Sequence, residues 1–267
     1  MTDIVANDVA NGFVFCGIVA MVDPPREEAR VAVASCQRAG IGVKMITGDH
    51  RDTAATIADA IGLRGDRTED GRLLAFTGAE LERMETEEFD IAARKAAVFA
   101  RVSPEQKLRL VESLQRQGNV VAMTGDGVND APALRQANIG VAMGMAGTDV
   151  AKDASDMILT DDNFATIVNA VEEGRTVFDN LLKFIVWTIP TNIGEGFIIV
   201  AAIALGVELP ILPVQILWIN MTTAVILGLP LAFEPRQPDV MDRQPRTPNA
   251  PLIDSSLMMR SLLVGAM

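Results

Sequence analysis

The acidic residues best placed to do chemistry lie in one short stretch, Met123 to Leu134, which reads MTGDGVNDAPAL. It follows an apolar run at residues 119–122 that is typical of a buried strand. Asp126 and Asp130 would then project from the strand end and from the loop after it. Two neighbouring carboxylates are costly unless a cation joins them. Mg²⁺ suits such a pair because it prefers oxygen ligands and usually bridges carboxylate to phosphate.

The residues around these two acids fit a turn between a strand and a helix. Gly125 and Gly127 allow the backbone to turn sharply. Asn129 adds a neutral polar group, and Pro132 suits the first turn of the following helix. An ordinary Gly-Asp turn without chemistry would explain a bare GDG, but it leaves the rest of the string unexplained.

The whole string closely resembles the hinge motif of the P-type ATPases, which belong to the haloacid dehalogenase-like superfamily. The resemblance implies that Asp126 holds Mg²⁺. It also implies that Asp130, together with Asn129, supports the phosphorylation site. ATP is then the expected substrate, with Mg²⁺ as the cofactor.

A second motif, Thr47, Gly48 and Asp49, follows the strand predicted at residues 41–46. A Thr hydroxyl beside backbone donors at a strand end can hold a phosphoryl oxygen, and the matching superfamily motif uses its Thr in that way. Either Thr47 or Asp49 could instead cap the helix predicted from His50 to Ile61. We expect Asp49 to cap and Thr47 to bind, with His50 solvated and without a chemical role.

Lys107 is the third candidate, one turn into a helix predicted to start with Ser103 as N-cap and Pro104 at its first position. The superfamily places a Lys here to neutralise the phosphoryl oxygens and the attacked carboxylate, a role that suits a compact ammonium. A lone Lys on an exposed helix would carry no function. Its position in RVSPEQK, ahead of GDGVND, favours the catalytic role.

Strands and helices alternate over the first part of the chain, which predicts an α/β fold with a parallel sheet and helices on both faces. The resemblance specifies this as a haloacid dehalogenase-like Rossmannoid sheet. Ligands of such sheets bind at the carboxyl ends of strands, where Thr47, Lys107 and Asp126 lie. Strands are predicted at 13–22, 41–46, 97–100, 119–122 and 138–143, and helices at 27–39, 50–61, 77–93 and from 103.

An acid-rich stretch follows the predicted strand at 138–143. Its acids are Asp149, Asp153, Asp156, Asp161 and Asp162. Their spacing does not fit an EF-hand, because the required Gly and terminal Glu are missing. We expect this stretch to be structural.

The bulk composition excludes several classes of function. A net charge of −12 and a pI near 4.6 argue against nucleic acid as a partner, because phosphate binding needs clustered basic residues. Cys16 and Cys36 have no zinc-site spacing, and the single His50 provides no histidine cluster.

The last part of the chain predicts membrane helices. Residues 164–183 are amphipathic, 184–207 hold Glu195 as their one charge and are long enough to cross a bilayer, and 211–233 are uncharged. Lys183 precedes these spans, and the arginines of the next loop follow them. The positive-inside rule therefore puts the α/β domain and that loop in the cytoplasm. The basic residues of the loop are Arg236, Arg243 and Arg246.

Polar residues inside these spans predict an ion pathway. A carboxylate at the bilayer centre costs about 2.5–3.5 kcal/mol on insertion scales, so Glu195 needs a function there. By resemblance, Asn192, Glu195, Asn220 and Thr223 match cation ligands of calcium-type and sodium-type pumps. Ala224 departs from the pattern, because the family has an acid at that position. For Asn220 and Thr223, interhelical hydrogen bonding is the alternative.

The resemblance also implies a division of the chain. Residues 1–12 end the nucleotide-binding domain or hinge, and 13–163 form the carboxyl-side part of the phosphorylation domain. A stalk helix follows at 164–183, with membrane helices at 184–207 and 211–233, a cytoplasmic loop at 234–256 and the start of another membrane helix at 257–267. The loop sequence DVMDRQPR is similar to the loop after the sixth helix of calcium-type pumps.

The family is phosphorylated on the Asp of a DKTG motif, which does not occur in this sequence. We therefore expect the carboxyl-side part of an ATP-driven cation pump, inactive alone, that works through an aspartyl phosphate. Its expected partners are the transported cation, membrane lipid, and the upstream nucleotide-binding domain and helices. The expected location is a prokaryotic plasma membrane, as a multi-pass protein. The alternatives are a membrane-tethered phosphatase, with Asp23 as its only candidate nucleophile, and an inactive remnant.

Overall fold

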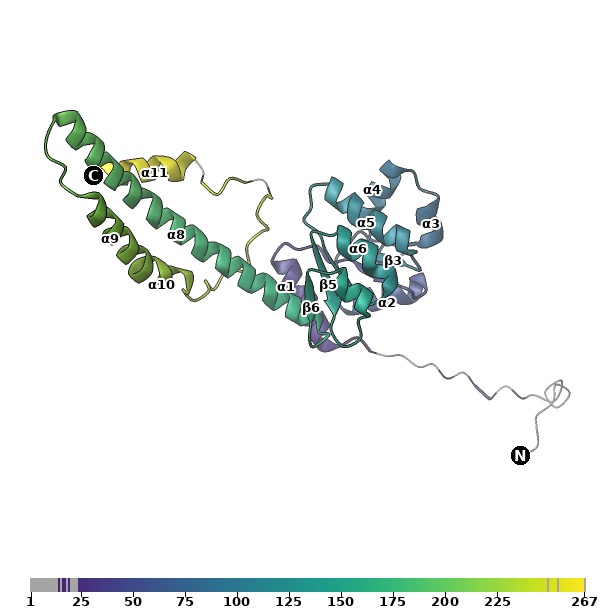
Figure 1. Cartoon of the computed structure of the whole chain (residues 1–267). Helices are drawn as coiled ribbons and strands as arrows, with labels where there is room; N and C mark the ends of the chain where they lie inside the picture. Colours follow the sequence, from purple (N-terminus) through teal and green to yellow (C-terminus); the bar gives the residue numbers. More distant parts are fainter. Residues whose placement is uncertain are drawn as a thin grey trace.

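The structure is a computed structural model that describes residues 14, 16, 17, 19, 24–248, 250–253 and 255–266. An α/β domain is followed by one long helix, α8, which leads to a second helical segment and a further helix beside it (Figure 1). The strand predicted at 13–22 and the candidate nucleophile Asp23 fall almost entirely outside the described residues.

All the strand pairs in the described part of the chain are parallel, which confirms the predicted α/β class. The strands form two three-stranded sheets, in the orders β1-β3-β2 and β4-β5-β6, rather than one continuous ladder. Their bounds are Met45–Thr47 (β1), Ala75–Thr77 (β2), Val98–Ala100 (β3), Ala122–Gly125 (β4), Ile139–Met143 (β5) and Met157–Leu159 (β6).

The helices of the α/β domain follow their capping signals. Ser103 is the N-cap of α5, as predicted. It accepts a hydrogen bond from the Gln106 N–H, and the Gln106 side chain accepts one from the Ser103 N–H, so the two form a capping box. The helix predicted at 77–93 is in fact two helices. The bounds are Glu27–Arg38 (α1), Arg51–Ala60 (α2), Gly78–Glu82 (α3), Thr86–Lys95 (α4), Pro104–Arg116 (α5), Ala131–Gln136 (α6) and Asp149–Asp153 (α7).

The edges of the two sheets meet near the predicted phosphoryl site. β1 and β4 are both edge strands of their sheets. Ile46 of β1 packs against the core cluster around Phe99 and also against the cluster that contains Met123 of β4. The two edges therefore lie on one shared core, although no ladder joins β1 to β4.

The predicted stalk and first membrane span form a single helix, α8, from Phe164 to Leu205. It begins at the N-cap Asn163, continues through Pro190 and ends at Gly206, whose left-handed φ of 66° is typical of a helix C-terminus. The second segment comprises α9 (Pro213–Thr223), a π-helical stretch (Ala224–Gly228) and α10 (Leu229–Ala232), and α11 spans Ser255–Ala266. Residues 164–205 and 213–232 are long and apolar enough to cross a membrane.

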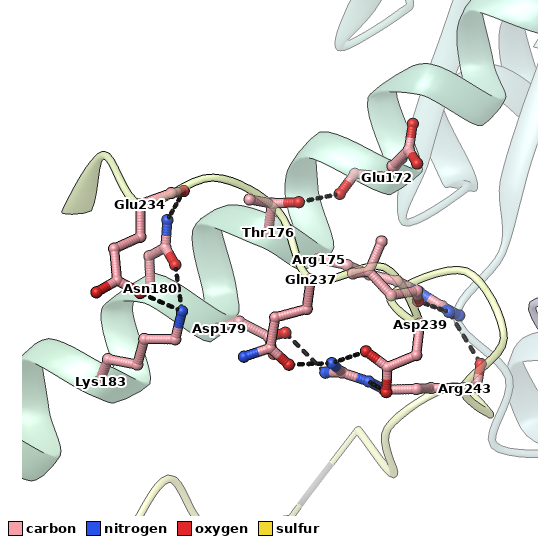
Figure 2. Close-up of polar contacts among 11 residues, drawn as sticks. Glu172, Arg175, Thr176, Asp179, Asn180, Lys183, Glu234, Gln237, Asp239 and Arg243 are labelled. Atoms are coloured by element: carbon pink, nitrogen blue, oxygen red, sulfur yellow. Dashed lines mark hydrogen bonds and ion pairs between the residues drawn. The ribbon is translucent and has the colours of Figure 1, made fainter. Parts of the chain in front are cut away.

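After α10, the loop at residues 234–248 folds back along one face of α8 (Figure 2). Lys183 pairs with Glu234 at 2.6 Å, and Arg243 pairs with Asp179 at 2.7 Å. The α8 residues that face the loop recur every three or four positions, so they share one side of the helix. They are Glu172, Arg175, Asp179, Asn180 and Lys183.

Arg175 connects this loop to the α/β domain. Its Nη1 donates to the carbonyl oxygens of Val240 and Arg243, each at 2.9 Å. Its Nη2 donates to the carbonyl of Ala39, directly after α1, at 2.8 Å. Val240 is buried beside this contact. One guanidinium on α8 thus holds both the loop and the end of a helix from the α/β domain.

Replacing this guanidinium should release the loop. Arg175→Met keeps much of the side-chain volume but leaves three carbonyl oxygens without their donor. An unsatisfied buried polar group costs about 1–3 kcal/mol. We expect faster tryptic cleavage within residues 234–248, measured by mass spectrometry of timed digests. Arg38→Met removes an exposed arginine whose only side-chain hydrogen bond to a described residue is to Ser35, so it should leave the cleavage rate unchanged. Equal rates in both variants would contradict the assignment.

Candidate phosphoryl-transfer and ion sites

The centre of the predicted catalytic site is the carboxylate of Asp130, which is 6% exposed. Its Oδ1 accepts a hydrogen bond from Lys107 Nζ at 2.7 Å. Its Oδ2 accepts from the backbone N–H groups of Gly127 at 3.1 Å and Asp126 at 3.3 Å. The structure therefore brings two of the predicted catalytic residues into contact, and it turns the loop after β4 around one negative charge.

Gly125 has a different reason for being glycine than the predicted sharp turn. It is the last residue of β4 and does not have a positive φ. A Cβ at this position would lie 2.5 Å from the Cβ of Asp130. The strand predicted at 119–122 lies three residues later, at Ala122–Gly125, so its predicted bounds were wrong; glycine is required at position 125 because Asp130 packs directly against the backbone.

Asp126 lies just beyond β4 with its side chain exposed. Among the described residues, its carboxylate has no hydrogen-bond or ion-pair partner, although its backbone carbonyl accepts from the Thr148 N–H at 2.8 Å. No group of three or more His, Cys, Asp or Glu residues gathers there in the described part of the chain. A free carboxylate beside an ion-paired one fits Mg²⁺, which binds through one or two carboxylates and completes its shell with phosphate and water.

Thr47 ends β1, as the motif required, but Asp49 does not cap the next helix. The N-cap of α2 is His50, which makes no side-chain capping bond, so the predicted Asp49 cap was wrong. Instead, the Thr47 hydroxyl donates to Asp49 Oδ2 and accepts from the Asp49 N–H, each at 3.1 Å. Gly48 is exposed beside them, and no bond links this turn to Lys107 within the described residues.

Asn129, the remaining predicted catalytic residue, lies in the short 3₁₀ turn Val128–Asp130 with its side chain exposed. Its side chain makes no hydrogen bond to another described residue. It is therefore available to a ligand.

Of the predicted ion ligands, the structure joins Glu195 and Asn220. Asn220 Nδ2 donates to Glu195 Oε2 at 2.9 Å, across the contact between α8 and α9. Thr223 turns its hydroxyl to the carbonyl of Ile219 at 2.8 Å, within its own helix. Asn192 is exposed, one turn before Glu195, and has no side-chain partner among the described residues. Ala224 opens the π-helical stretch, an element that frequently marks functional sites.

Two sets of contacts around the loop after β4, residues 126–130, were not predicted from the sequence. The Thr148 N–H holds the backbone of Asp126, and Asp162 binds the loop that leads to Thr148. The acid-rich stretch contains both residues, but spacing alone did not reveal their partners, because each contact joins residues far apart in the chain.

Comparisons with known families agree with this geometry. The family model for haloacid dehalogenase-like hydrolases matches residues 4–138, and a second model of that description matches residues 107–171. The chain belongs to the haloacid dehalogenase-like hydrolases. The model described as "Cation transporting ATPase, C-terminus" matches residues 208–267, over the helical region that follows the turn after α8.

The chain is also similar to curated proteins that are named as cation-transporting ATPases, in agreement with the predicted resemblance. The chain is 62% identical over 261 residues to "Probable cation-transporting ATPase F" of Mycobacterium tuberculosis. The aligned region covers 98% of this chain and 29% of that protein. It is 52% identical over 258 residues to "Cation-transporting ATPase pma1" of Synechocystis, covering 97% and 28%. It is 45% identical over 255 residues to "Calcium-transporting ATPase 1" of Bacillus cereus, covering 94% and 28%. The chain therefore spans less than a third of the length of these relatives.

The packing of Asp130 against β4 gives a matched pair of glycine substitutions. Gly125→Ala places a Cβ 2.5 Å from the Asp130 Cβ and should displace Asp130 from Lys107. Overpacking of this kind costs about 1–3 kcal/mol, so the melting temperature should fall by several degrees. At Gly127 the nearest atom is Asp130 Oδ2 at 3.5 Å, an ordinary contact, so Gly127→Ala should change the melting temperature little. The same loss in both variants would refute a specific contact at Gly125.

Proposed function

We propose that this chain is the phosphorylation and ion-pathway segment of an ATP-driven cation pump. The observation that carries the proposal is the buried Asp130–Lys107 pair beside the free carboxylate of Asp126, at the carboxyl end of a parallel strand. The cation-transporting relatives and the two apolar helices support the same function. The proposed partners are the transported cation, lipid, and the remaining pump segments.

Each catalytic residue then has a distinct task. Lys107, fixed by Asp130, supplies positive charge to the oxygens of the transferred phosphoryl group. The Thr47 hydroxyl and the N–H groups of its turn hold one of these oxygens. Asp126 and Asn129 face the open side of the site. Mg²⁺ held by Asp126 would neutralise charge on the phosphoryl group, with ATP as the proposed donor.

We infer that the phosphorylated aspartate comes from another segment of the pump. No DKTG occurs in this sequence. The edge strands β1 and β4 share a core through Ile46, and neither pairs with the other. A parallel strand entering between them would join the two sheets and end beside Thr47 and Asp126. This position would bring a nucleophile within reach of both motifs.

The ion pathway is proposed to lie between α8 and the π-helical part of the second segment. Glu195 is the only acid within the described apolar parts of these helices, and Asn220 already contacts it. Ca²⁺ favours six to eight oxygen ligands and several charges, whereas Ala224 provides neither charge nor oxygen. We therefore propose at most one ion between these helices and weaker Ca²⁺ selectivity than in a calcium pump, which makes a monovalent ion or a proton a credible substrate. The proposed location is a prokaryotic plasma membrane, crossed several times.

The first test concerns the proposed Mg²⁺ ligand. In the complete pump, Asp126→Asn should abolish phosphorylation from ATP, because the charge that holds Mg²⁺ is lost while size is kept. The fold should stay intact, since the Asp126 side chain is exposed and makes no bond to described residues. Acid-stable label from γ-labelled ATP and the melting temperature measure the two effects. Asp153→Asn, at the end of α7, is the control acid and should be labelled normally. Near-normal phosphoenzyme in Asp126→Asn would exclude this residue as the ligand.

The second test concerns the ion. ATPase stimulation by Ca²⁺, Na⁺, Mg²⁺, Mn²⁺ and protons is compared for the wild-type pump and two variants. Glu195→Gln should remove stimulation, because it neutralises the carboxylate that contacts Asn220. Ala224→Asp should shift preference toward divalent ions, because it adds both charge and oxygen. Glu208→Gln, in the turn between the helices, should behave as wild type. Full ion-stimulated ATPase activity in Glu195→Gln would refute the proposed site.

A further inference from the structure

The segment Asp161–Asn163 joins β6 to α8 and makes contacts in two directions. Toward the α/β domain, the carboxylate of Asp162 accepts hydrogen bonds from the N–H groups of Met145 at 3.0 Å and Ala146 at 2.7 Å. Asp162 has a φ of 49°, a left-handed conformation that is uncommon for residues other than glycine. A carboxylate that accepts two backbone N–H groups is acting as the anchor of a loop.

The backbone of the anchored loop, residues 144–148, approaches neighbouring carbonyl groups closely at both of its glycines. A Cβ on Gly144 would lie 2.6 Å from the carbonyl oxygen of Leu159, and a Cβ on Gly147 would collide with the carbonyl of Met143. The Gly144 N–H also donates to the Leu159 carbonyl at 2.8 Å. Glycine is therefore required at both positions, and only a short stretch of backbone separates the groups held by Asp162 from Thr148.

The other end of this loop holds the predicted Mg²⁺ ligand. The Thr148 N–H donates to the backbone carbonyl of Asp126 at 2.8 Å. The Thr148 hydroxyl accepts from the Ala151 N–H at 3.3 Å and so caps α7. A continuous set of contacts therefore runs from the Asp162 carboxylate, through residues 145–148, to the backbone of Asp126.

In the other direction, the same segment starts the membrane helix. Asn163 is the N-cap of α8, and its Oδ1 accepts from the Ala165 N–H at 2.9 Å. The Asp161 carboxylate accepts from the Thr166 hydroxyl at 2.6 Å. Asn163 Nδ2 donates to Glu28 of α1 at 2.9 Å. Asp162, which holds the loop at residues 144–148, and Asn163, the N-cap of α8, are thus consecutive residues.

We propose that Asp162 is a positioning residue for Asp126, which it reaches through the loop at residues 144–148, and that it fixes the Mg²⁺ ligand relative to the start of α8. This inference rests on the proposed function, because it takes Asp126 as the metal ligand. A metal ligand that is displaced slightly binds less well, and partners that orient ligands typically contribute 10- to 100-fold in affinity. The Met145 and Ala146 N–H groups hold the pKa of Asp162 below its usual range, so the carboxylate is ionised at neutral pH.

The first experiment measures Mg²⁺ dependence in the complete pump. Phosphorylation by labelled inorganic phosphate is titrated with Mg²⁺ in wild type, Asp162→Ala and Asp162→Asn. Asp162→Ala should raise the half-saturating Mg²⁺ concentration about tenfold. The half-saturating Mg²⁺ concentration of Asp162→Asn should lie between those of wild type and Asp162→Ala. The amide oxygen of Asn can accept one of the two hydrogen bonds, and Asn tolerates the left-handed conformation.

Two further variants separate the carboxylate from its surroundings. Asp162→Gly keeps the left-handed backbone without strain but removes the acceptor, so it should match Asp162→Ala. Asp161→Ala removes the neighbouring acid, which contacts Thr166 and not the loop, so its half-saturating concentration should equal that of wild type. A wild-type value in Asp162→Gly, or an equal rise in Asp161→Ala, would overturn the inference.

The second experiment has a readout that does not require turnover. Hydrogen exchange of peptides covering residues 144–148 should be faster in Asp162→Ala than in wild type, without Mg²⁺ present, while peptides of α5 exchange as before. If the wild-type pump forms no Mg²⁺-dependent phosphoenzyme, the proposed function fails whatever the exchange shows. If wild type is phosphorylated normally but Asp162→Ala has unchanged Mg²⁺ dependence or unchanged loop exchange, only the role of Asp162 fails.

Discussion

The loop after β4, residues 126–130, is arranged around one negative charge, the carboxylate of Asp130. It is buried, and it is satisfied by Lys107 Nζ and by two N–H groups of its own loop. Breaking a buried ion pair by removing one partner costs about 3–5 kcal/mol, and less here because the Lys107 side chain is 21% exposed. This requirement explains why glycine stands at position 125. It also explains why a capping box at Ser103 fixes the first turn of α5, from which Lys107 extends.

The same pairing leaves the Asp126 carboxylate without a partner among the described residues, and the proposed function depends on this difference between the two nearby acids. Both carboxylate oxygens of Asp130 already accept hydrogen bonds, from Lys107 and from the loop. Asp126 has no competing partner among the described residues and lies at the open end of the strand. Two carboxylates four residues apart thus differ in burial and bonding, which is the basis for proposing that one shapes the site and the other meets the ligand.

Much of the fold could be predicted because its signals are local. The helices α1 and α5 were predicted from the residues at their ends, and α8 from its long uninterrupted pattern. The strands β2 and β6 were missed, and they are strands only through pairing with β3 and β5, which are distant in the chain. The Asp49 cap was wrong because the hydroxyl of Thr47 competes for that carboxylate.

The candidate sites follow the same division between local and distant contacts. Sequence motifs indicated Asp126, Lys107 and Glu195 as candidate site residues, but the residues that contact them depend on tertiary structure. Asn220 meets Glu195 across two helices, and Thr148 meets Asp126 across a strand and a helix. Neither spacing nor composition could have identified Asp162, since an Asp after a strand is an ordinary turn residue until the loop that it anchors is known.

The basic residues that predicted membrane orientation also have a structural role that charge counting does not reveal. Arg236 and Arg243 both pair with acids of α8, and Arg246 stacks 4.6 Å above the ring of Phe178. Exposed ion pairs contribute only about 0–1 kcal/mol each and weaken with salt. The Arg175 guanidinium, in contrast, donates to carbonyl groups of the loop and of the end of α1 at the same time. Hydrogen bonds from a charged donor to partly buried acceptors are screened by salt much less than exposed ion pairs are. The link between the loop, α8 and the α/β domain therefore depends more on this donor than on the more numerous surface charges, and it should persist at ionic strengths that weaken the outer pairs.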